Sequence, residues 1–285
     1  MRQAGVVDSA RGLAPRSHVG WGYADRAEFR TRAREYLLDG IAAGQRVEFV
    51  GSGTVAALRA ELTGGIPHIR RDAVDRGVLR VALVDEVYTF SGTGRVVDPD
   101  RSAAARALAT EDALADGYTG LRAVVDATAL AGTAVQRAAY AHYEYLLDRQ
   151  STVLPLATIC AYDSVRLGPV AVAEMACLHP LASRGASAFR LYADDGAAFA
   201  LAGEIDFSSA GQLAETLGRV LPLMSGPELV VDGRQLEFID HRGLLVLDRC
   251  AGEHDVRLAL RTFRETAAQI AEALGLPHLR VDVLR

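Results

Sequence analysis

The chain has 285 residues, about twice the usual length of a single domain, and its 50% hydrophobic and 24% charged residues are ordinary for a globular protein with a sizeable core. Its net charge of −5 is opposite in sign to the basic excess by which proteins meet nucleic-acid phosphates. Lysine and asparagine do not occur, which excludes Schiff-base, pyridoxal phosphate and P-loop lysine chemistry.

The cysteines and the start of the chain indicate the compartment. Cys160, Cys177 and Cys250 form no C-x-x-C pair, so their spacing indicates neither a disulfide framework nor a thiolate zinc site. Residues 1–17 have no apolar core of a signal peptide, and no apolar run approaches the roughly 18–20 residues needed to span a bilayer. We therefore expect a cytoplasmic protein without a membrane contact.

The first two thirds of the chain alternate between two kinds of apolar pattern. Residues 1–17 are rich in Gly, Pro, Ser and Arg and are expected to form a flexible leader. After it, the spacing predicts helices over 25–43, 52–61, 99–115, 132–148 and 169–177, and strands over 46–51, 78–84, 121–126 and 153–161. Strands that alternate with helices of this length predict an α/β domain with a mainly parallel sheet.

The rhythm changes after a short joint of small residues at 184–187. Two strands over 189–192 and 198–205 flank an Asp-Asp-Gly turn, which predicts a hairpin. Further helices are predicted over 208–223, 243–250 and 267–274, and further strands over 228–231, 256–262 and 280–284. We expect a smaller second α/β domain over 188–285, which also carries the whole excess of negative charge.

Two phrases in this last third carry a family resemblance. The first is ALAGEID at 200–206, and the second is ELVVDGRQLEFID at 228–240, followed by GLLVL at 243–247. In this order they resemble the STAS domain, the anti-sigma factor antagonist module of bacterial partner switching, over essentially all of 188–285. The resemblance implies a STAS-type α/β fold that docks on an anti-sigma factor or a related switch protein. The candidate partner-binding residues are Asp206, Asp240, His241, Arg242 and Gly243.

The turn between strand and helix departs from that family. Most regulated members place a phosphorylated Ser or Thr just before the glycine, whereas this turn reads Asp240-His241-Arg242-Gly243. Because the turn has no hydroxyl, Ser/Thr phosphorylation cannot add its negative charge at this helix N-terminus. Two interpretations stay open. Either the loop has drifted and serves packing alone, or it forms a partner surface that Ser/Thr phosphorylation does not switch and that offers Arg242 to an acidic partner.

A longer series of phrases covers residues 18–182. The series consists of HVGWGY at 18–23, YLLDGIAAGQRV at 36–47, DEVY at 85–88, GRVVDPD at 94–100, ADGYTGLR at 115–122, YE at 143–144, ICAYD at 159–163 and HP at 179–180. In this order the phrases resemble the MEDS domain, a sensory module named for methanogen and methylotroph regulators and thought to be related to RecA/KaiC-like ATPases. The resemblance implies a sensory domain over 18–183 with a RecA/KaiC-like, mainly parallel sheet.

A glycine-rich loop follows the first predicted strand, where a RecA-like nucleoside triphosphatase places its phosphates. Gly51 and Gly53 would let backbone N–H groups approach an anion at a helix N-terminus. The Lys-Ser/Thr pair that holds the β- and γ-phosphates and magnesium is missing, so ATP hydrolysis by the usual route is not expected. Whether the loop still binds a nucleotide stays open.

Polar and aromatic side chains near the predicted strand ends suggest a pocket. Because ligands of doubly wound sheets bind beyond the carboxyl ends of the strands, Cys160 and Tyr162 favour a small organic ligand at that edge. The candidate ligand-binding residues are His18, Tyr23, Gly51, Gly53, Glu144, Cys160, Tyr162 and His179. The bland alternative is that Cys160 is a buried small hydrophobe and that the histidines are structural. A His/His/Cys metal site is chemically feasible, but these residues lack ligand spacing, so we expect neither a metal nor a cofactor.

Together these patterns predict a non-enzymatic bacterial signalling regulator. A sensory domain that binds a small organic molecule would be coupled to a STAS-like domain that docks on a protein partner, without direct nucleic-acid contact. Self-association as a homo-oligomer is left open. Two alternatives also remain. One is an enzyme built on Cys160, His179 and Glu144, and the other is a ligand-free scaffold of a signalling assembly.

Overall fold

A seven-stranded sheet forms the centre of the first body of the chain. The structure, a computed structural model, describes residues 4–63, 78–92 and 94–285. The strand order is β1-β9-β2-β8-β7-β3-β4, and all neighbouring pairs run parallel. The strands are β1 (Gly5–Val7), β2 (His18–Tyr23), β3 (Arg46–Gly51), β4 (Leu79–Leu83), β7 (Leu121–Asp126), β8 (Leu156–Asp163) and β9 (Leu181–Ser183).

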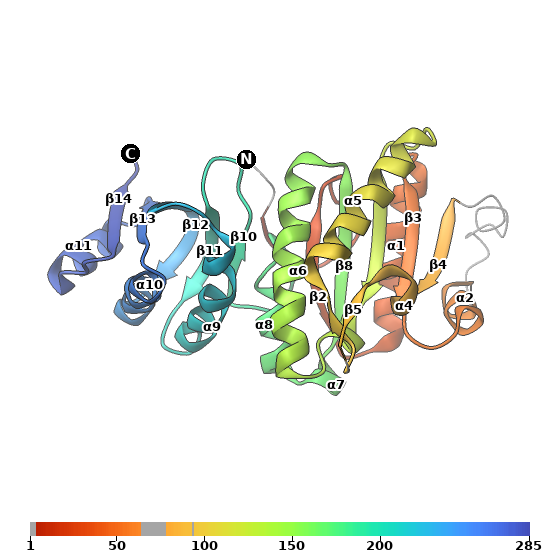
Figure 1. Cartoon of the computed structure of the whole chain (residues 1–285), viewed down its shortest axis with the longest axis horizontal. Helices are drawn as coiled ribbons and strands as arrows, with labels where there is room; N and C mark the ends of the chain where they lie inside the picture. The colour runs from red at the N-terminus through yellow and green to blue at the C-terminus, as the bar shows by residue number, and fades with distance from the viewer. Residues whose placement is uncertain (1–3, 64–77, 93) are drawn as a thin grey trace.

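Helices cover both faces of this sheet (Figure 1). They are α1 (Arg26–Ala42), α2 (Val55–Thr63), α4 (Val84–Val87), α5 (Pro99–Ala115), α6 (Ala134–Val153), α7 (Ser164–Leu167) and α8 (Pro169–Ala176), with a single turn η1 (Ala127–Leu130) and a hairpin of β5 (Phe90–Ser91) and β6 (Val96–Val97). Phe29 of α1 and Leu58 of α2 share one core with Ile159 of β8, whereas Tyr140 of α6 and Met175 of α8 share another with Cys160. The expected α/β class with a mainly parallel sheet and flanking helices is confirmed.

Local chemistry explains where the helices begin and end. The side chain of Asp25 caps α1 by accepting from Ala27 N–H, and Thr133 caps α6 in a reciprocal box with Gln136. Helix α5 coincides with the predicted 99–115. Helix α6 continues five residues beyond its predicted end because the first helix breaker after it is Pro155.

The strand β2 was not predicted from the sequence. Gly20 and Gly22 interrupt its apolar run, and such glycines normally weaken a strand. In the structure they allow α8 to pack directly on the sheet, since a Cβ at Gly20 would lie 2.8 Å from the Cα of Ala176. These glycines therefore make β2 hard to predict from the sequence, and in the structure they allow α8 to pack closely against it.

The expectation of a flexible leader over 1–17 is wrong for the described part of that segment. Residues 5–7 form β1, which pairs with β9 at the edge of the sheet. Ala10 and Leu13 are buried, and the Leu13 carbonyl accepts a hydrogen bond of 3.1 Å from the buried Arg122 guanidinium. The segment pairs and packs despite its turn-rich composition because Ala10 and Leu13 are buried against the body of the domain.

The second body is built on a separate five-stranded mixed sheet. Its order is β10-β11-β12-β13-β14, with β10 and β11 antiparallel and the other pairs parallel. The strands are β10 (Phe189–Tyr192), β11 (Phe199–Ile205), β12 (Glu228–Ile239), β13 (Arg257–Thr262) and β14 (Leu279–Val283), and the helices are α9 (Ala210–Val220), η2 (Leu221–Leu223), α10 (His241–Glu253) and α11 (Glu265–Leu274). The predicted hairpin and the α/β character of this body are confirmed.

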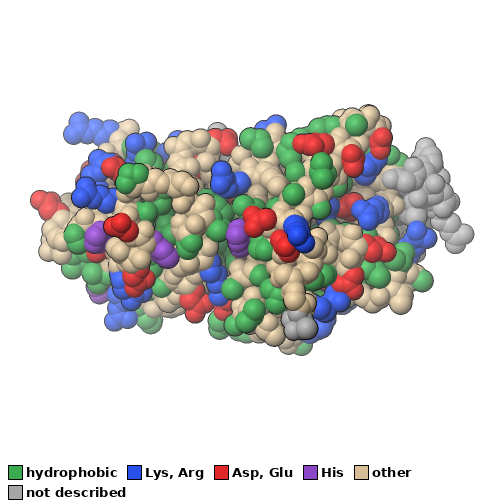
Figure 2. All heavy atoms as spheres, viewed as in Figure 1, with side chains coloured by type: hydrophobic (Ala, Val, Ile, Leu, Met, Phe, Trp, Pro, Cys, Tyr) green, Lys and Arg blue, Asp and Glu red, His purple; other side chains and the backbone are tan. Residues whose placement is uncertain are grey.

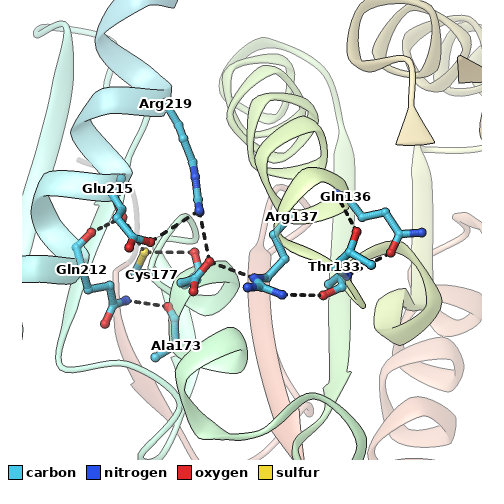
Figure 3. A network of polar contacts seen from close by, with 11 residues as sticks. Thr133, Gln136, Arg137, Ala173, Cys177, Gln212, Glu215 and Arg219 are labelled. Carbon is cyan, nitrogen blue, oxygen red and sulfur yellow. Dashed lines mark hydrogen bonds and ion pairs between the residues drawn. The ribbon is translucent and has the colours of Figure 1, made fainter. Parts of the chain in front are cut away.

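Buried contacts join the two bodies besides the chain at 184–187. Helix α6 packs against α9, and apolar side chains of both bodies belong to one core. The carboxylate of Glu174 in α8 accepts from Arg137 of α6 at 2.9 Å and from Arg219 of α9 at 3.1 Å. Both arginines are labelled in Figure 3. Nearby, Gln212 donates to the Ala173 carbonyl at 2.7 Å. The boundary between the bodies is therefore a packed interface.

Charge is spread over both bodies. On the face shown in Figure 2, arginines and carboxylates are interspersed along the length of the molecule. The described residues contain no helix with the length and apolar composition that crossing a membrane requires.

Truncation of Leu13 tests the packing of the leader. We expect Leu13→Ala to lower the free energy of unfolding by about 2 kcal/mol, because the lost methyl groups lie in the core. The control Val6→Ala changes a half-exposed residue of β1 and should stay within about 0.5 kcal/mol of the parent. Urea unfolding followed by circular dichroism measures both, and equal, negligible effects would show that the leader does not pack.

Candidate functional site

Five of the predicted ligand-binding residues meet on the face of the first sheet that α6 and α8 cover. His18 begins β2, Cys160 and Tyr162 lie two residues apart on β8, Glu144 belongs to α6 and His179 follows α8. All five side chains are 0% exposed. We call His18, Glu144, Cys160 and His179 the buried cluster.

Strand alternation and a missing side chain create the space for the buried cluster. Cys160 and Tyr162 point to the same face because side chains alternate along a strand. Gly20 is the neighbour of Cys160 across the β2–β8 pair, and a Cβ at Gly20 would lie 3.0 Å from Nδ1 of His179. The imidazole of His179 thus fits where a larger residue on β2 would exclude it.

The carboxylate of Glu144 lies at the centre of the buried cluster. Its Oε2 is 3.0 Å from His18 Nε2, 3.4 Å from Cys160 Sγ and 3.5 Å from His179 Nε2. Cys160 Sγ lies 3.7 Å from His18 Nε2, and the four potential ligand atoms all lie within 4.8 Å of one another. Side chains from segments that lie far apart in the sequence of the first body are therefore in direct contact.

A second layer of groups orients the buried cluster. Asp148 Oδ1 lies 2.9 Å from His18 Nδ1, and the hydroxyl of Tyr162 donates to Glu144 Oε1 at 2.8 Å. The other oxygen of Asp148 accepts the backbone N–H of Ala193, in the second body, at 2.7 Å. A chain of hydrogen bonds thus runs from the buried cluster across the interface between the bodies.

The tautomer of His179 follows from its surroundings. Its Nδ1 lies 3.0 Å from the Met175 carbonyl oxygen, which can only accept, so Nδ1 carries the proton. Burial, together with the charge of His18, lowers the pKa of His179. Its Nε2 has no hydrogen-bond partner among the described residues.

The other members of the buried cluster have shifted pKa values. Burial opposes protonation of His18, but hydrogen bonds to Asp148 and Glu144 outweigh it and raise the His18 pKa. Burial alone would raise the pKa of Glu144, yet the neighbouring His179 and His18 hold it well below its usual value. Burial and the Glu144 carboxylate raise the pKa of the Cys160 thiol. A protonated thiol that is closed to solvent does not suit a nucleophile for an external substrate.

Tyr23, Gly51 and Gly53 lie outside the buried cluster. Tyr23 points to the opposite face of the sheet, where its hydroxyl lies 3.4 Å from Asp126. The expectation that residues 46–51 form the first strand is wrong, since β1 and β2 precede them. A Cβ at Gly51 would meet Leu58 at 2.9 Å, and Gly53 has a φ of 111°, so packing and turn geometry account for both glycines.

The candidate partner-binding residues gather at the carboxyl ends of β11 and β12. Asp206 follows β11 and accepts from Ser208, whereas Asp240 caps α10 by accepting from Gly243 N–H at 2.9 Å. His241 and Arg242, in the first turn of α10, are exposed. A Cβ at Gly243 would lie 2.7 Å from side-chain atoms of both strands, so this glycine allows α10 to approach the sheet.

A cleft of about 770 Å³ lies between the two bodies and was not predicted. Tyr145 and Arg149 of α6 line one wall, and the turn at 193–198 together with η2 lines the other. Residues so far apart in the sequence show no common pattern, so only the structure reveals the cleft. In the same way, sequence reasoning missed Asp148, although its spacing of four residues from Glu144 places both carboxylates on one helix face.

Removal of the Tyr162 hydroxyl tests the charge on Glu144. We expect Tyr162→Phe to lower the free energy of unfolding by about 1.5–3 kcal/mol, because a buried carboxylate loses a donor. The matched control is Tyr88→Phe, which removes a neutral hydroxyl pair of 3.3 Å with Tyr140 and should cost about 0.5–1.5 kcal/mol. Denaturant unfolding compares the two variants. If Tyr162→Phe costs no more than its control, the carboxylate is not ionised.

Comparison with known proteins supports the sensory resemblance. The sequence profile described as MEDS, the MEthanogen/methylotroph, DcmR Sensory domain, matches residues 17–180, which is more than half of the chain. No curated protein matches the chain. These comparisons give no support to a STAS identity for residues 188–285, which stays a prediction. The chain belongs to the MEDS family of sensory domains, and its role is therefore in signalling.

Proposed function

We propose that the chain is a signalling regulator in which a small organic molecule binds in the cleft between the two bodies and changes how the second body docks on a protein partner. Membership of a sensory family favours a ligand. The observation that carries the proposal is that both bodies line the cleft. A molecule in the cleft contacts both bodies, so it favours one arrangement of them over others.

The lining of the cleft limits the chemistry of the ligand. Its volume of about 770 Å³ lies within the range of small-molecule sites. Asp100, Asp194 and Asp195 contribute carboxylates, and Arg149 is the cation among the described lining residues. The excess of negative charge favours a neutral or cationic ligand over an anion.

Asp148 connects the cleft with the buried cluster. The turn at 193–198 lines the cleft, and its Ala193 N–H is held by Asp148, the partner of His18. At the other end of the turn, the Tyr145 hydroxyl donates to the Ala198 carbonyl at 3.2 Å. A ligand that displaces this turn would act on both contacts, which links the sensory domain to the second body.

The second body offers a surface for the partner. Phe207, Phe238 and Phe263 lie near the carboxyl ends of β11, β12 and β13 and are 69%, 50% and 53% exposed. Arg242, also exposed, offers a positive charge beside the carboxyl ends of β11 and β12, where Glu204 and Glu237 are exposed as well, so a partner would meet apolar side chains and charges of both signs. The STAS resemblance and this placement support docking on an anti-sigma factor or a related switch protein.

Filling the cleft tests its role. We expect Ala104→Trp, at an exposed position of α5 in the lining, to abolish binding of the small molecule. The control is Ala57→Trp at an exposed position of α2, away from the lining. Native and denaturing mass spectrometry of the full chain, followed by a thermal-shift screen of neutral and cationic compounds, measures binding. Ligand binding that survives Ala104→Trp unchanged would contradict the proposal.

We expect that a partner-switching kinase does not phosphorylate the turn at 240–243. Incubation of the full chain with such a kinase and labelled ATP should leave residues 238–246 unlabelled, since they contain no Ser or Thr. In Arg242→Ser, which restores the hydroxyl just before Gly243, we expect label at this turn. Stoichiometric label on residues 238–246 of the parent chain would contradict this expectation.

A further inference from the structure

The unpartnered Nε2 of His179 is the unexplained feature of the buried cluster. It lies 3.5 Å from Glu144 Oε2, and both side chains are fully buried. Nδ1 is paired with the Met175 carbonyl oxygen, so Nε2 is the ring nitrogen that faces the carboxylate, and it has no hydrogen-bond partner among the described residues. A buried polar atom without a partner is costly. A cation between Nε2 and the carboxylate removes this cost.

The spacing of the ligand atoms fits one metal ion. Zinc binds nitrogen or oxygen at about 2.0–2.2 Å and thiolate sulfur at about 2.3 Å in a tetrahedron, so neighbouring ligand atoms lie roughly 3.3–3.6 Å apart. Of the six distances between the ligand atoms, those from Glu144 Oε2 to the other three atoms are 3.0, 3.4 and 3.5 Å, that from Cys160 Sγ to His18 Nε2 is 3.7 Å, and the remaining two are within 4.8 Å. An organic molecule does not fit among side chains in such contact.

The second layer also has the form that metal sites use. In such sites each ligating histidine usually donates its other ring N–H to a carboxylate or a backbone carbonyl, which fixes the ring and leaves the free nitrogen for the metal. His18 Nδ1 is paired with Asp148, and His179 Nδ1 with the Met175 carbonyl. The second oxygen of Glu144 accepts from Tyr162. These contacts hold the four potential ligand atoms, His18 Nε2, His179 Nε2, Glu144 Oε2 and Cys160 Sγ, within 4.8 Å of one another.

We propose that the buried cluster binds one zinc ion per chain, with His18, Glu144, Cys160 and His179 as its four ligands. A thiolate and two imidazoles favour zinc over magnesium or calcium. Because protein groups fill all four positions and no ligand is exposed, the ion is structural and carries no open position for a substrate. On binding, the Cys160 thiol releases its proton to solvent as the zinc–sulfur bond forms, and His18 releases to solvent the Nε2 proton that it shares with Glu144 as the zinc–nitrogen bond forms. This proposal replaces the expectation of no metal, which rested on sequence spacing alone, and it does not depend on the ligand of the cleft.

The site closes during folding. Its ligands come from β2, α6, β8 and the segment after α8, so no part of the chain binds the ion alone. Once the domain is folded, the ion has no contact with solvent and leaves only when the domain opens. A chelator should therefore remove zinc from the native chain far more slowly than from the chain in denaturant.

Metal analysis of the full chain tests the site. We expect purified protein to carry about one zinc per chain through gel filtration, as measured by inductively coupled plasma mass spectrometry. Cys160→Ala and His179→Gln should lose the ion, whereas Cys177→Ala, at an equally buried cysteine outside the buried cluster, should keep it. Asp148→Asn should keep the ion with an affinity about 10–100-fold lower, because Asp148 positions His18 and does not bind the metal.

Cobalt substitution keeps the test decisive if a variant fails to fold. The parent chain is unfolded with a chelator, refolded with equimolar Co²⁺ and examined by absorption spectroscopy. We expect the intense d–d bands of tetrahedral cobalt together with a thiolate charge-transfer band. A parent chain that refolds without holding zinc or cobalt would overturn the proposal. A thiolate charge-transfer band that persists in Cys160→Ala would also overturn the proposal.

Discussion

Glu144 and Asp148 lie one turn apart on α6, and both are fully buried. Removing a carboxylate from water costs several kcal/mol unless donors replace the lost hydration. The structure supplies those donors from three directions: the ring of His18 lies between the two carboxylates, Tyr162 donates to Glu144, and the backbone of Ala193 donates to Asp148. This one helix face therefore contacts β2 through His18, β8 through Tyr162 and the second body through Ala193.

The same helix joins the interior to the interface between the bodies. Tyr145 follows Glu144 directly, so it points away from the buried cluster and reaches the Ala198 carbonyl in the wall of the cleft. Around it, the bodies are held by Glu174 and its two arginines and by one continuous apolar core. A displacement of α6 therefore acts on the buried cluster and on the interface at once.

Much of the fold could be predicted from periodicity and caps. Helix α5, with Asp98 and Pro99 at its start, and the strand β7 coincide with their predicted ranges. The misses have physical causes. Gly20 and Gly22 give β2 the sequence pattern of a loop, but in the structure they allow α8 to pack closely on the sheet. The leader looks disordered by composition, and only the pairing of β1 with β9 shows where it lies.

The candidate site was predicted in its residue types but not in its geometry. Strand alternation indicates that Cys160 and Tyr162 share a face, and the resemblance pointed to His18, Glu144 and His179. Nothing in the sequence shows that these side chains touch, since a parallel sheet brings together segments that lie far apart along the chain. The one local signal is the spacing of four residues between Glu144 and Asp148, which indicates that both carboxylates lie on one helix face. The cleft had no such signal, because its walls belong to different bodies.

The pairing of β1 with β9 has a consequence for the order of folding. The first strand of the chain binds the last strand of its own body, and His18 likewise meets His179, so the first and last segments of this body close on each other. Contacts between such distant segments form slowly, and synthesis delivers the N-terminal partner long before the C-terminal one. During synthesis on the ribosome, one edge of the sheet therefore stays unpaired until residues 179–183 emerge. The second body, whose strands follow one another in sequence order, can begin to form soon after its own residues appear.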